Sequence, residues 1–185
     1  LNLQTILKQI KQIENLVNEF SDFARMPKPL FRKNNLVELF ESNIVLLNKI
    51  DNSITINLKL NNKKNIEIIC DYEQISRVIF NVIKNSIESI QEKAQKVQNI
   101  SKIIDIEILE RRDYIVINIF DDGIGFSKQN IKDLIKPYFT TKEKGSGLGL
   151  PIVTKIVNDH NGSIKFSSHS NGAKIEIILP KTNVS

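Results

Sequence analysis

The sequence of 185 residues has little that would cross-link the chain or anchor it in a membrane. Its single cysteine excludes an intramolecular disulfide and is consistent with a reducing compartment. No stretch approaches the roughly 20 apolar residues that cross a bilayer, and the start of the chain lacks a signal-peptide pattern. Cys70 follows Ile66-Glu67-Ile68-Ile69, which predicts a buried strand residue rather than a reactive thiol.

Tryptophan is absent, and aromatic residues make up 6% of the chain against 41% hydrophobic residues. We therefore expect a core of Ile, Leu and Val in one globular domain with an appendage. The net charge of +5 is modest, its basic and acidic residues are interleaved, and no basic run contains aromatics. This pattern does not support nucleic-acid binding and suits an anionic small ligand or an acidic protein partner.

Residues 1–25 carry a regular apolar seam whose members are spaced alternately three and four apart: Leu3, Ile6, Ile10, Ile13, Val17, Phe20 and Ala24. This heptad spacing predicts a helix about 37 Å long in a coiled coil or bundle. One interpretation is an amphipathic helix packed on its own domain, and the other is half of a helical hairpin that dimerises. The regular seam favours the second, and because the chain starts within it we expect a fragment of a longer protein.

Prolines at positions 27 and 29 end this helix, and residues 26–33 are expected to form a linker. Residues 34–181 then predict an α+β two-layer sandwich. The expected elements are a helix capped by Asn34, strands at 53–60 and 66–70, a helix capped by Asp71 that runs to about Val97, strands at 103–110 and 114–121, a short helix at 130–135 within a polar loop, a helix at 147–160, and a hairpin of 163–168 with 173–179.

Two glycine-rich turns carry the strongest chemical signal. Asp121-Asp122-Gly123-Ile124-Gly125-Phe126 ends an apolar strand, and Gly145-Ser146-Gly147-Leu148-Gly149-Leu150 opens a helix. A carboxylate can accept a hydrogen bond from an adenine amino group, and glycines turn backbone N–H groups toward phosphate. The two turns together predict a purine nucleotide pocket, although the first alone would be an ordinary Asp-Gly turn. The second is not a P-loop, because no Gly-Lys-Ser/Thr follows it. Nor is it a dinucleotide fingerprint, because its glycine spacing is wrong and no parallel-sheet unit surrounds it.

Asn81 and Asn85 lie four residues apart on the predicted long helix, so their carboxamides face the same way. A carboxamide oxygen is a good neutral ligand for Mg²⁺ that is held mainly by water and phosphate. Solvated surface asparagines are the simpler alternative, but the apolar flanks place the pair near the buried face. Between the glycine turns, Tyr138-Phe139-Thr140-Thr141-Lys142 adds an aromatic pair, two hydroxyls and a cation that can reach phosphate.

Four motifs of the sequence resemble, in order, the N, G1, F and G2 boxes of sensor histidine kinases. They are the asparagine pair, the first glycine turn, the Tyr138–Lys142 segment and the second glycine turn. That superfamily also includes gyrase B, MutL and the ninety-kilodalton heat-shock chaperone. The resemblance covers about residues 34–181 and implies a Bergerat-type ATP-binding fold, with a mixed sheet under helices. Residues 1–25 resemble the second helix of a dimerisation and phosphoacceptor hairpin, and the chain is most similar to nitrogen-regulation-type kinases.

The resemblance implies a role for each box. Asp121 would bind the adenine amino group, and Asn85 would coordinate Mg²⁺ with Asn81 nearby. Gly123 and Gly125 would shape the adenine pocket, under a lid over residues 126–144. The other implied nucleotide contacts are Thr140, Thr141, Lys142, Gly145, Gly147, Leu148 and Gly149. Many members carry basic or aromatic residues where this chain has Glu88 and Ser89, so we do not rely on a phosphate contact from that turn.

The resemblance implies phosphoryl transfer rather than hydrolysis. Gyrase-like and MutL-like ATPases place a glutamate, as the base, one turn before the magnesium asparagine, where this chain has Asn81. We therefore expect a protein-histidine kinase that binds Mg-ATP. The chain has two histidines. We expect a structural role for His160 and a surface position for His169, so the phosphoacceptor histidine is expected outside this chain.

Two alternatives stay open: a serine/threonine protein kinase of the same fold, as in anti-sigma factors, and a non-catalytic nucleotide-binding dimerisation module. The implied partners are a response-regulator receiver domain and a second copy of the chain, paired through the helical hairpin. No nucleic-acid partner is expected. We expect the fragment in the cytoplasm and its parent protein anchored in the bacterial inner membrane, facing the cytoplasm.

Overall fold

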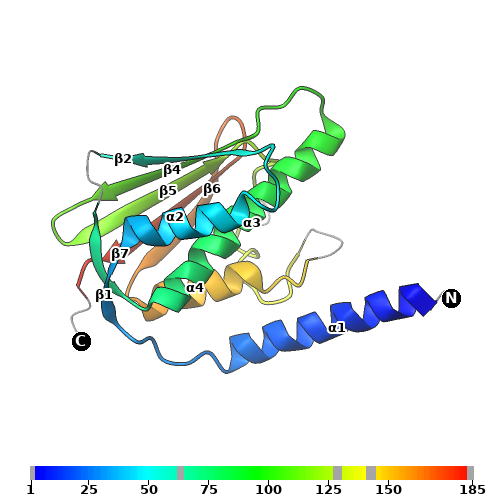
Figure 1. Cartoon of the computed structure of the whole chain (residues 1–185), viewed down its shortest axis with the longest axis horizontal. Helices are drawn as coiled ribbons and strands as arrows, with labels where there is room; N and C mark the ends of the chain where they lie inside the picture. Colours follow the sequence, from blue (N-terminus) through cyan, green and yellow to red (C-terminus); the bar gives the residue numbers. More distant parts are fainter. Residues whose placement is uncertain (1–2, 62–64, 127–130, 141–144, 183–185) are drawn as a thin grey trace.

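The computed structural model describes residues 3–61, 65–126, 131–140 and 145–182. The elements in chain order are α1 (Leu3–Ala24), β1 (Arg32–Asn35), α2 (Leu36–Leu47), β2 (Thr55–Leu60), β3 (Glu67–Cys70), α3 (Tyr72–Lys96), β4 (Ile103–Glu110), β5 (Tyr114–Asp121), α4 (Gly149–Asp159), β6 (Ser163–Ser168) and β7 (Ala173–Pro180). Helices α2, α3 and α4 cover one face of a sheet, and α1 extends away from that sheet (Figure 1).

The main sheet has the strand order β2-β4-β5-β7-β6. Strands β2 and β4 are parallel, whereas the other neighbouring pairs are antiparallel. On the central strand β5, Ile119 lies opposite Ile106 of β4 and opposite Ile175 of β7. A separate antiparallel ladder joins β1 to β3. The sheet is therefore mixed and lies under helices, which confirms the predicted α+β two-layer sandwich.

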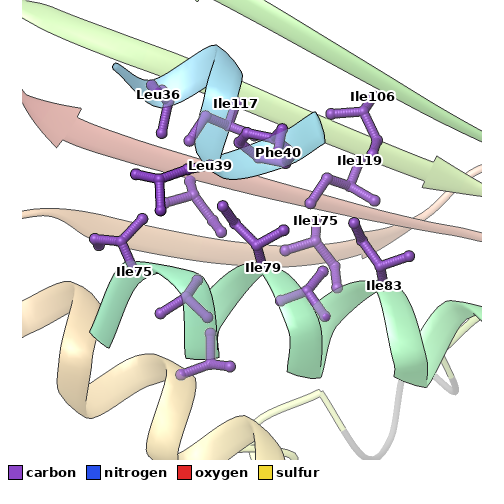
Figure 2. Packing of buried hydrophobic residues seen from close by; sticks show 14 of the residues in the cluster. Leu36, Leu39, Phe40, Ile75, Ile79, Ile83, Ile106, Ile117, Ile119 and Ile175 are labelled. Atoms are coloured by element: carbon purple, nitrogen blue, oxygen red, sulfur yellow. The ribbon is translucent and has the colours of Figure 1, made fainter. Parts of the chain in front are cut away.

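The core lies between the sheet and the helices. Figure 2 shows Leu39 and Phe40 of α2 and Ile79 of α3 packed near Ile117 and Ile119 of β5, and each of these side chains is at most 2% exposed. Burying one such side chain contributes about 1.5–3 kcal/mol. The buried apolar stripe of α3 comprises Ile75, Val78, Ile79, Val82, Ile83, Ile87 and Ile90. Because this stripe fixes the rotation of α3, it also decides where the polar side chains on its other face point.

Asp71 and His160 join the start of α3 to the end of α4. As predicted, Asp71 caps α3, and its Oδ1 accepts a hydrogen bond from the N–H of Gln74 at 3.0 Å. The N–H of Asp71 donates to Nε2 of His160 at 3.0 Å, while Nδ1–H of His160 donates to the carbonyl of Ile156 at 2.8 Å. This arrangement needs a neutral ring, and burial lowers the pKa of His160 accordingly. The predicted structural role of His160 is confirmed.

The predicted cap of α2 is wrong by one residue. Oδ1 of Asn35, not of Asn34, accepts the N–H of Val37 at 3.1 Å. Asn34 lies within β1, and its Nδ2 donates to the carbonyl of Cys70 at 3.0 Å. Strand β1 begins at Arg32, inside the predicted linker, because it pairs with β3. Cys70 is completely buried, as its strand pattern predicts.

The loop between β5 and α4 differs from the expectation. Asn130, the first residue of the predicted short helix, lies outside the described residues, and residues 131–135 form turns instead of a helix. Helix α4 begins at Gly149, two residues later than predicted, because Gly147 has a φ of +69° that is incompatible with a right-handed helix.

The apolar seam of α1 is exposed. Its members Leu3, Ile6, Ile10, Ile13, Val17 and Phe20 are between 40% and 71% exposed. The ring of Phe20 stacks against Tyr138, with 6.3 Å between their centroids, at the edge of the domain. The seam therefore does not pack into the core of its own domain, which was the first of the two interpretations.

A search of the described helices finds none long and apolar enough to cross a membrane.

Candidate nucleotide-binding site

A cavity of about 310 Å³ lies between α3 and the segment that leads into α4. One face of α3 contributes six lining side chains: Arg77, Asn81, Lys84, Asn85, Glu88 and Ser89. At 3.6 residues per turn these positions fall within an arc of about 140°. Residues 124–126 and 145–152, without Leu148, form much of the remaining wall together with Leu134, Phe139 and Thr140. Segments that are distant in the sequence thus enclose one space.

Most of the predicted site residues meet at this cavity. It is lined by Asn81, Asn85, Gly125, Thr140, Gly145, Gly147 and Gly149. Three other predicted residues, Asp121, Gly123 and Leu148, are buried next to lining residues rather than in the wall itself. Thr141 and Lys142 lie outside the described residues.

Asp121 ends β5, and its side chain is 4% exposed. Its Oδ1 accepts hydrogen bonds from the N–H groups of Gly123, at 3.0 Å, and Ala173, at 3.2 Å. Its Oδ2 accepts one from the hydroxyl of Ser86 at 2.9 Å. A carboxylate has about four acceptor positions, so Oδ2 keeps one for a further donor. Burial raises the pKa of Asp121, and the three hydrogen bonds oppose that shift.

Sequence reasoning missed three residues that position Asp121. Ser86 belongs to the buried stripe of α3, and a polar residue within an apolar stripe is the signal that could have identified it. Nε2–H of His169 donates to the backbone carbonyl of Asp121 at 3.0 Å. A Cβ on Gly172 would lie 2.0 Å from the same carbonyl oxygen, so this position requires glycine.

His169 is less exposed than its predicted surface position implies. Its ring is half-buried and packs edge-on against Phe120, with 5.8 Å between the centroids. The sequence around His169 is polar, which is why a solvent-exposed position was predicted for it. The pairing of β6 with β7 and of β7 with β5 brings this end to Asp121, and sequence patterns do not report such long-range contacts.

The second glycine turn packs directly on the Tyr138 segment. Gly147 has a φ of +69°, and a Cβ there would lie 2.6 Å from the carbonyl carbon of Tyr138. The N–H of Tyr138 donates to the carbonyl of Gly147 at 3.1 Å. Phe139 and Thr140 follow at once and line the cavity. The turn and this segment therefore form one wall.

The asparagine pair faces the start of α4. A Cβ on Gly149 would lie 3.7 Å from Nδ2 of Asn85 and 3.9 Å from Oδ1 of Asn81. Leu148, the N-cap of α4, makes no side-chain capping hydrogen bond among the described residues. The first turn of a helix has N–H groups without intrahelical partners and the positive end of the helix dipole. Two carboxamides and these donors thus meet at a place that suits an anion.

The described residues contain no group of three or more His, Cys, Asp or Glu side chains that could hold a metal ion. Mg²⁺ has a different requirement, because it is usually bound by one or two protein oxygens together with water and phosphate oxygens. Asn81 and Asn85 are carboxamides beside the anion site, where Oδ1 of Asn81 and Nδ2 of Asn85 lie nearest to Gly149. These donors fit a Mg²⁺ ion that arrives with a nucleotide.

Comparisons with known proteins agree with this geometry. The family model for histidine kinase-, DNA gyrase B-, and HSP90-like ATPases matches residues 70–183. A putative sensor histidine kinase NtrY-like from Rickettsia typhi is 36% identical over 176 residues, which are 95% of this chain and 28% of that protein. The chain thus spans less than a third of this relative.

Two solved structures share the fold. The catalytic domain of histidine kinase ThkA has a TM-score of 0.72 and 25% identity, over 83% of this chain and 97% of that domain. Histidine kinase ThkA in complex with response regulator protein TrrA has a TM-score of 0.77 and 22% identity, over 97% of this chain and 50% of that chain. The family match covers more than half of the chain and includes α3 and both glycine turns. The chain therefore belongs to the family of histidine kinase-, DNA gyrase B-, and HSP90-like ATPases.

Proposed function

We propose that the chain is the ATP-binding catalytic module of a sensor histidine kinase. In the proposed reaction a histidine nitrogen attacks the γ-phosphorus of ATP, the bond to the β,γ-bridging oxygen breaks, and ADP leaves. The phosphoryl group then passes to an aspartate of a response regulator. The similarity to a putative NtrY-like sensor histidine kinase and to the catalytic domain of ThkA supports this assignment.

The single observation that carries the proposal is the identity of residue 81. Asn81 faces the start of α4 one turn before Asn85, where a hydrolysing member of the family would carry a glutamate base. A carboxamide cannot accept a proton from water at neutral pH. Among the described residues that line the cavity, Glu88 is the one carboxylate, and it lies one turn beyond Asn85 and 3.9 Å from Lys84. The site therefore suits a bound ATP that awaits an external nucleophile.

Each part of the site has a defined task in this function. The free acceptor position on Oδ2 of Asp121 takes the adenine amino group. The start of α4 and the turn at Gly147 hold the phosphates through backbone N–H groups. Mg²⁺, with Asn85 as its ligand and Asn81 beside it, would neutralise charge on the phosphates. Thr140 lines the cavity. Thr141 and Lys142, which lie outside the described residues, are proposed as further nucleotide contacts.

Neither histidine of the chain is suited to be the phosphoacceptor. Both ring nitrogens of His160 form hydrogen bonds inside the domain, and its ring is 2% exposed. His169 donates from Nε2 to Asp121 and accepts from the N–H of Asn171 at Nδ1. An acceptor must instead present an accessible nitrogen to the γ-phosphoryl group. We therefore place it on a dimerisation helix outside this chain.

The exposed seam of α1 supports the proposed domain organisation. Residues 1–25 would form the second helix of a dimerisation hairpin and residues 34–181 the bulk of the catalytic domain. The linker predicted at residues 26–33 is shortened to residues 26–31, because β1 begins at Arg32. The seam exposes six large apolar side chains, and burying them in a helical bundle would contribute several kcal/mol. A homodimer formed through a helical bundle uses this kind of apolar surface. A response-regulator receiver domain is the proposed phosphoryl recipient, and the parent protein is proposed to be anchored in the membrane.

A calorimetric titration with Mg-ATP, followed by phosphate release on the same sample, tests the proposal. We expect binding with negligible phosphate release, because Asn81 supplies no base. Robust release would refute the assignment to phosphoryl transfer and favour an ATPase. Absence of binding would refute the proposed ATP-binding module and leave a degenerate dimerisation module.

A further inference from the structure

Arg77 borders two cavities at once. It lines the nucleotide cavity one helical turn before Asn81. It also lines a second cavity of about 500 Å³, whose wall includes Met26 and Pro27 from the segment after α1 and Ile156 of α4. The Arg77 side chain is half-buried. It therefore stands where the nucleotide cavity meets the surface next to the end of α1.

The order of contacts along α3 places Arg77 at the far end from the proposed adenine site. Ser86 bonds to Asp121, and the asparagine pair faces the start of α4. Arg77 lies nine residues before Ser86 on α3, a separation of about 14 Å along the helix axis at 1.5 Å per residue. A base, a ribose and three phosphates extend over a comparable length. A nucleotide with its base at Asp121 and its phosphates beside α4 thus directs its last phosphate toward Arg77.

The charges of the cavity lead to the same residue. Among the described lining residues the cations are Arg77 and Lys84. The terminal phosphate carries the highest charge density of a nucleoside triphosphate. The planar guanidinium of arginine matches two phosphate oxygens at once and stays protonated at all relevant pH values. Arginine is thus the side chain best suited to hold that phosphate at the mouth of the cavity.

We propose that Arg77 contacts the terminal phosphoryl group of ATP and thereby distinguishes the triphosphate from the diphosphate. The inference rests on the proposed function and adds to it a residue for the phosphate end of the site. Since Arg77 also borders the cavity beside Met26 and Pro27, the phosphoryl group that it holds faces the side of the domain from which an acceptor helix would approach.

The test compares Mg-ATP and Mg-ADP binding by calorimetry in wild type, Arg77→Ala and Arg77→Gln. Arg112→Ala is the matched control, because it removes the same charge from the exposed turn before β5, at the opposite end of that strand from Asp121. Both Arg77 variants lose a charged hydrogen bond to the terminal phosphate, so we expect their Mg-ATP affinity to fall at least about tenfold. Their Mg-ADP affinity should stay unchanged within about twofold. Arg112→Ala should leave both affinities unchanged.

Mg-ADP binding and thermal melting show which Arg77 variants are folded. Two results, in a variant that melts like the wild type, would overturn the role of Arg77. One is an equal loss of affinity for both nucleotides, and the other is no loss of affinity for either. The neutral glutamine variant retains most of the side-chain volume, so it carries the test if the alanine variant does not fold. A wild-type chain that binds neither nucleotide would instead refute the proposed function itself, and the two failures are therefore distinguishable.

Discussion

The hydroxyl of Ser86 donates a hydrogen bond to Oδ2 of Asp121 at 2.9 Å, and this bond connects the buried face of α3 to the end of β5. The bond also orients the carboxylate. Two backbone N–H groups occupy Oδ1, so the acceptor position that remains lies on the oxygen bound by Ser86. The helix that provides the asparagine pair therefore also positions the carboxylate proposed to recognise adenine.

Asp121→Asn should weaken Mg-ATP binding without unfolding the domain. The carboxamide oxygen can keep both backbone hydrogen bonds, and its amino group can donate to the Ser86 hydroxyl. That amino group, however, replaces the acceptor that adenine needs. Losing a charged hydrogen bond predicts at least about a tenfold loss of affinity by calorimetry. Burial raises the pKa of Asp121, so a neutral residue also avoids the cost of a buried charge, and the melting temperature should not fall markedly.

Asp122→Asn is the matched control for this substitution. Asp122 follows directly after the end of β5, and it is not among the described residues that line the cavity. The same chemical change there should leave Mg-ATP affinity unchanged. If Asp121→Asn bound Mg-ATP as tightly as the wild type, adenine recognition by Asp121 would be wrong and the non-catalytic module would gain support.

The stability of the domain should decrease in acid because of His160. Burial lowers the pKa of this ring in the folded chain, whereas the unfolded chain titrates near 6.5. The neutral ring therefore contributes stability that is fully present above about pH 6.5 and is lost as the pH falls below it. The free energy of unfolding should decline by up to about 1.4 kcal/mol per pH unit in that range. Urea unfolding from about pH 5.5 to 7.5 measures this slope.

Two variants isolate the contribution of His160. His160→Gln removes the titrating ring and should flatten the slope, at the cost of a lower stability at neutral pH. His169→Gln leaves the Asp71–His160 hydrogen bond in place and should keep the wild-type slope. Equal slopes in wild type and His160→Gln would show that other groups cause the acid sensitivity.

Local sequence signals predicted the elements whose structure depends on neighbouring residues. Strands β4 and β5 have the predicted bounds because their apolar and turn residues alternate clearly. Asp71 caps α3 as predicted, because a capping side chain needs only the backbone N–H three residues later. The motif residues that line the cavity were also found, since glycine turns and an i, i+4 pair are readable from spacing.

Features that depend on distant parts of the chain were not predicted. Strand β1 exists because β3 pairs with it, and this pairing displaced the helix cap from Asn34 to Asn35. His169 reaches Asp121 through the order of strands in the sheet, although 48 residues separate the two. The short segment 131–135 mixes apolar and charged residues, and none of its side chains is buried, so nothing in the core supports a helix there.

Cys70 should be unreactive in the folded chain. Its side chain is completely buried in β3, and burial raises the pKa of the thiol to about 11. The reactive thiolate is therefore rare at neutral pH, and a reagent cannot reach it. Titration with a chromogenic disulfide should detect no thiol in the native chain and one per chain after unfolding in denaturant. Rapid stoichiometric reaction of the native chain would contradict the buried position.

Gly147→Ala should disturb the nucleotide site more than the core. Its Cβ would lie within 2.6 Å of Tyr138 backbone atoms, and alanine is strained at a φ of +69°. The wall that contains Phe139 and Thr140 must then shift, so calorimetry should show weaker Mg-ATP binding. The expected loss is about tenfold, since a residue held at positive φ costs about 1–3 kcal/mol.

Gly162→Ala is the informative contrast to Gly147→Ala. A Cβ on Gly162 would lie 2.5 Å from the carbonyl oxygen of Ile178, in the sheet that supports the whole domain. This variant should lower the melting temperature more than Gly147→Ala, and its folded fraction should bind Mg-ATP normally. The reverse pattern would mean that the turn at Gly147 stabilises the core and that its contact with Tyr138 does not shape the site.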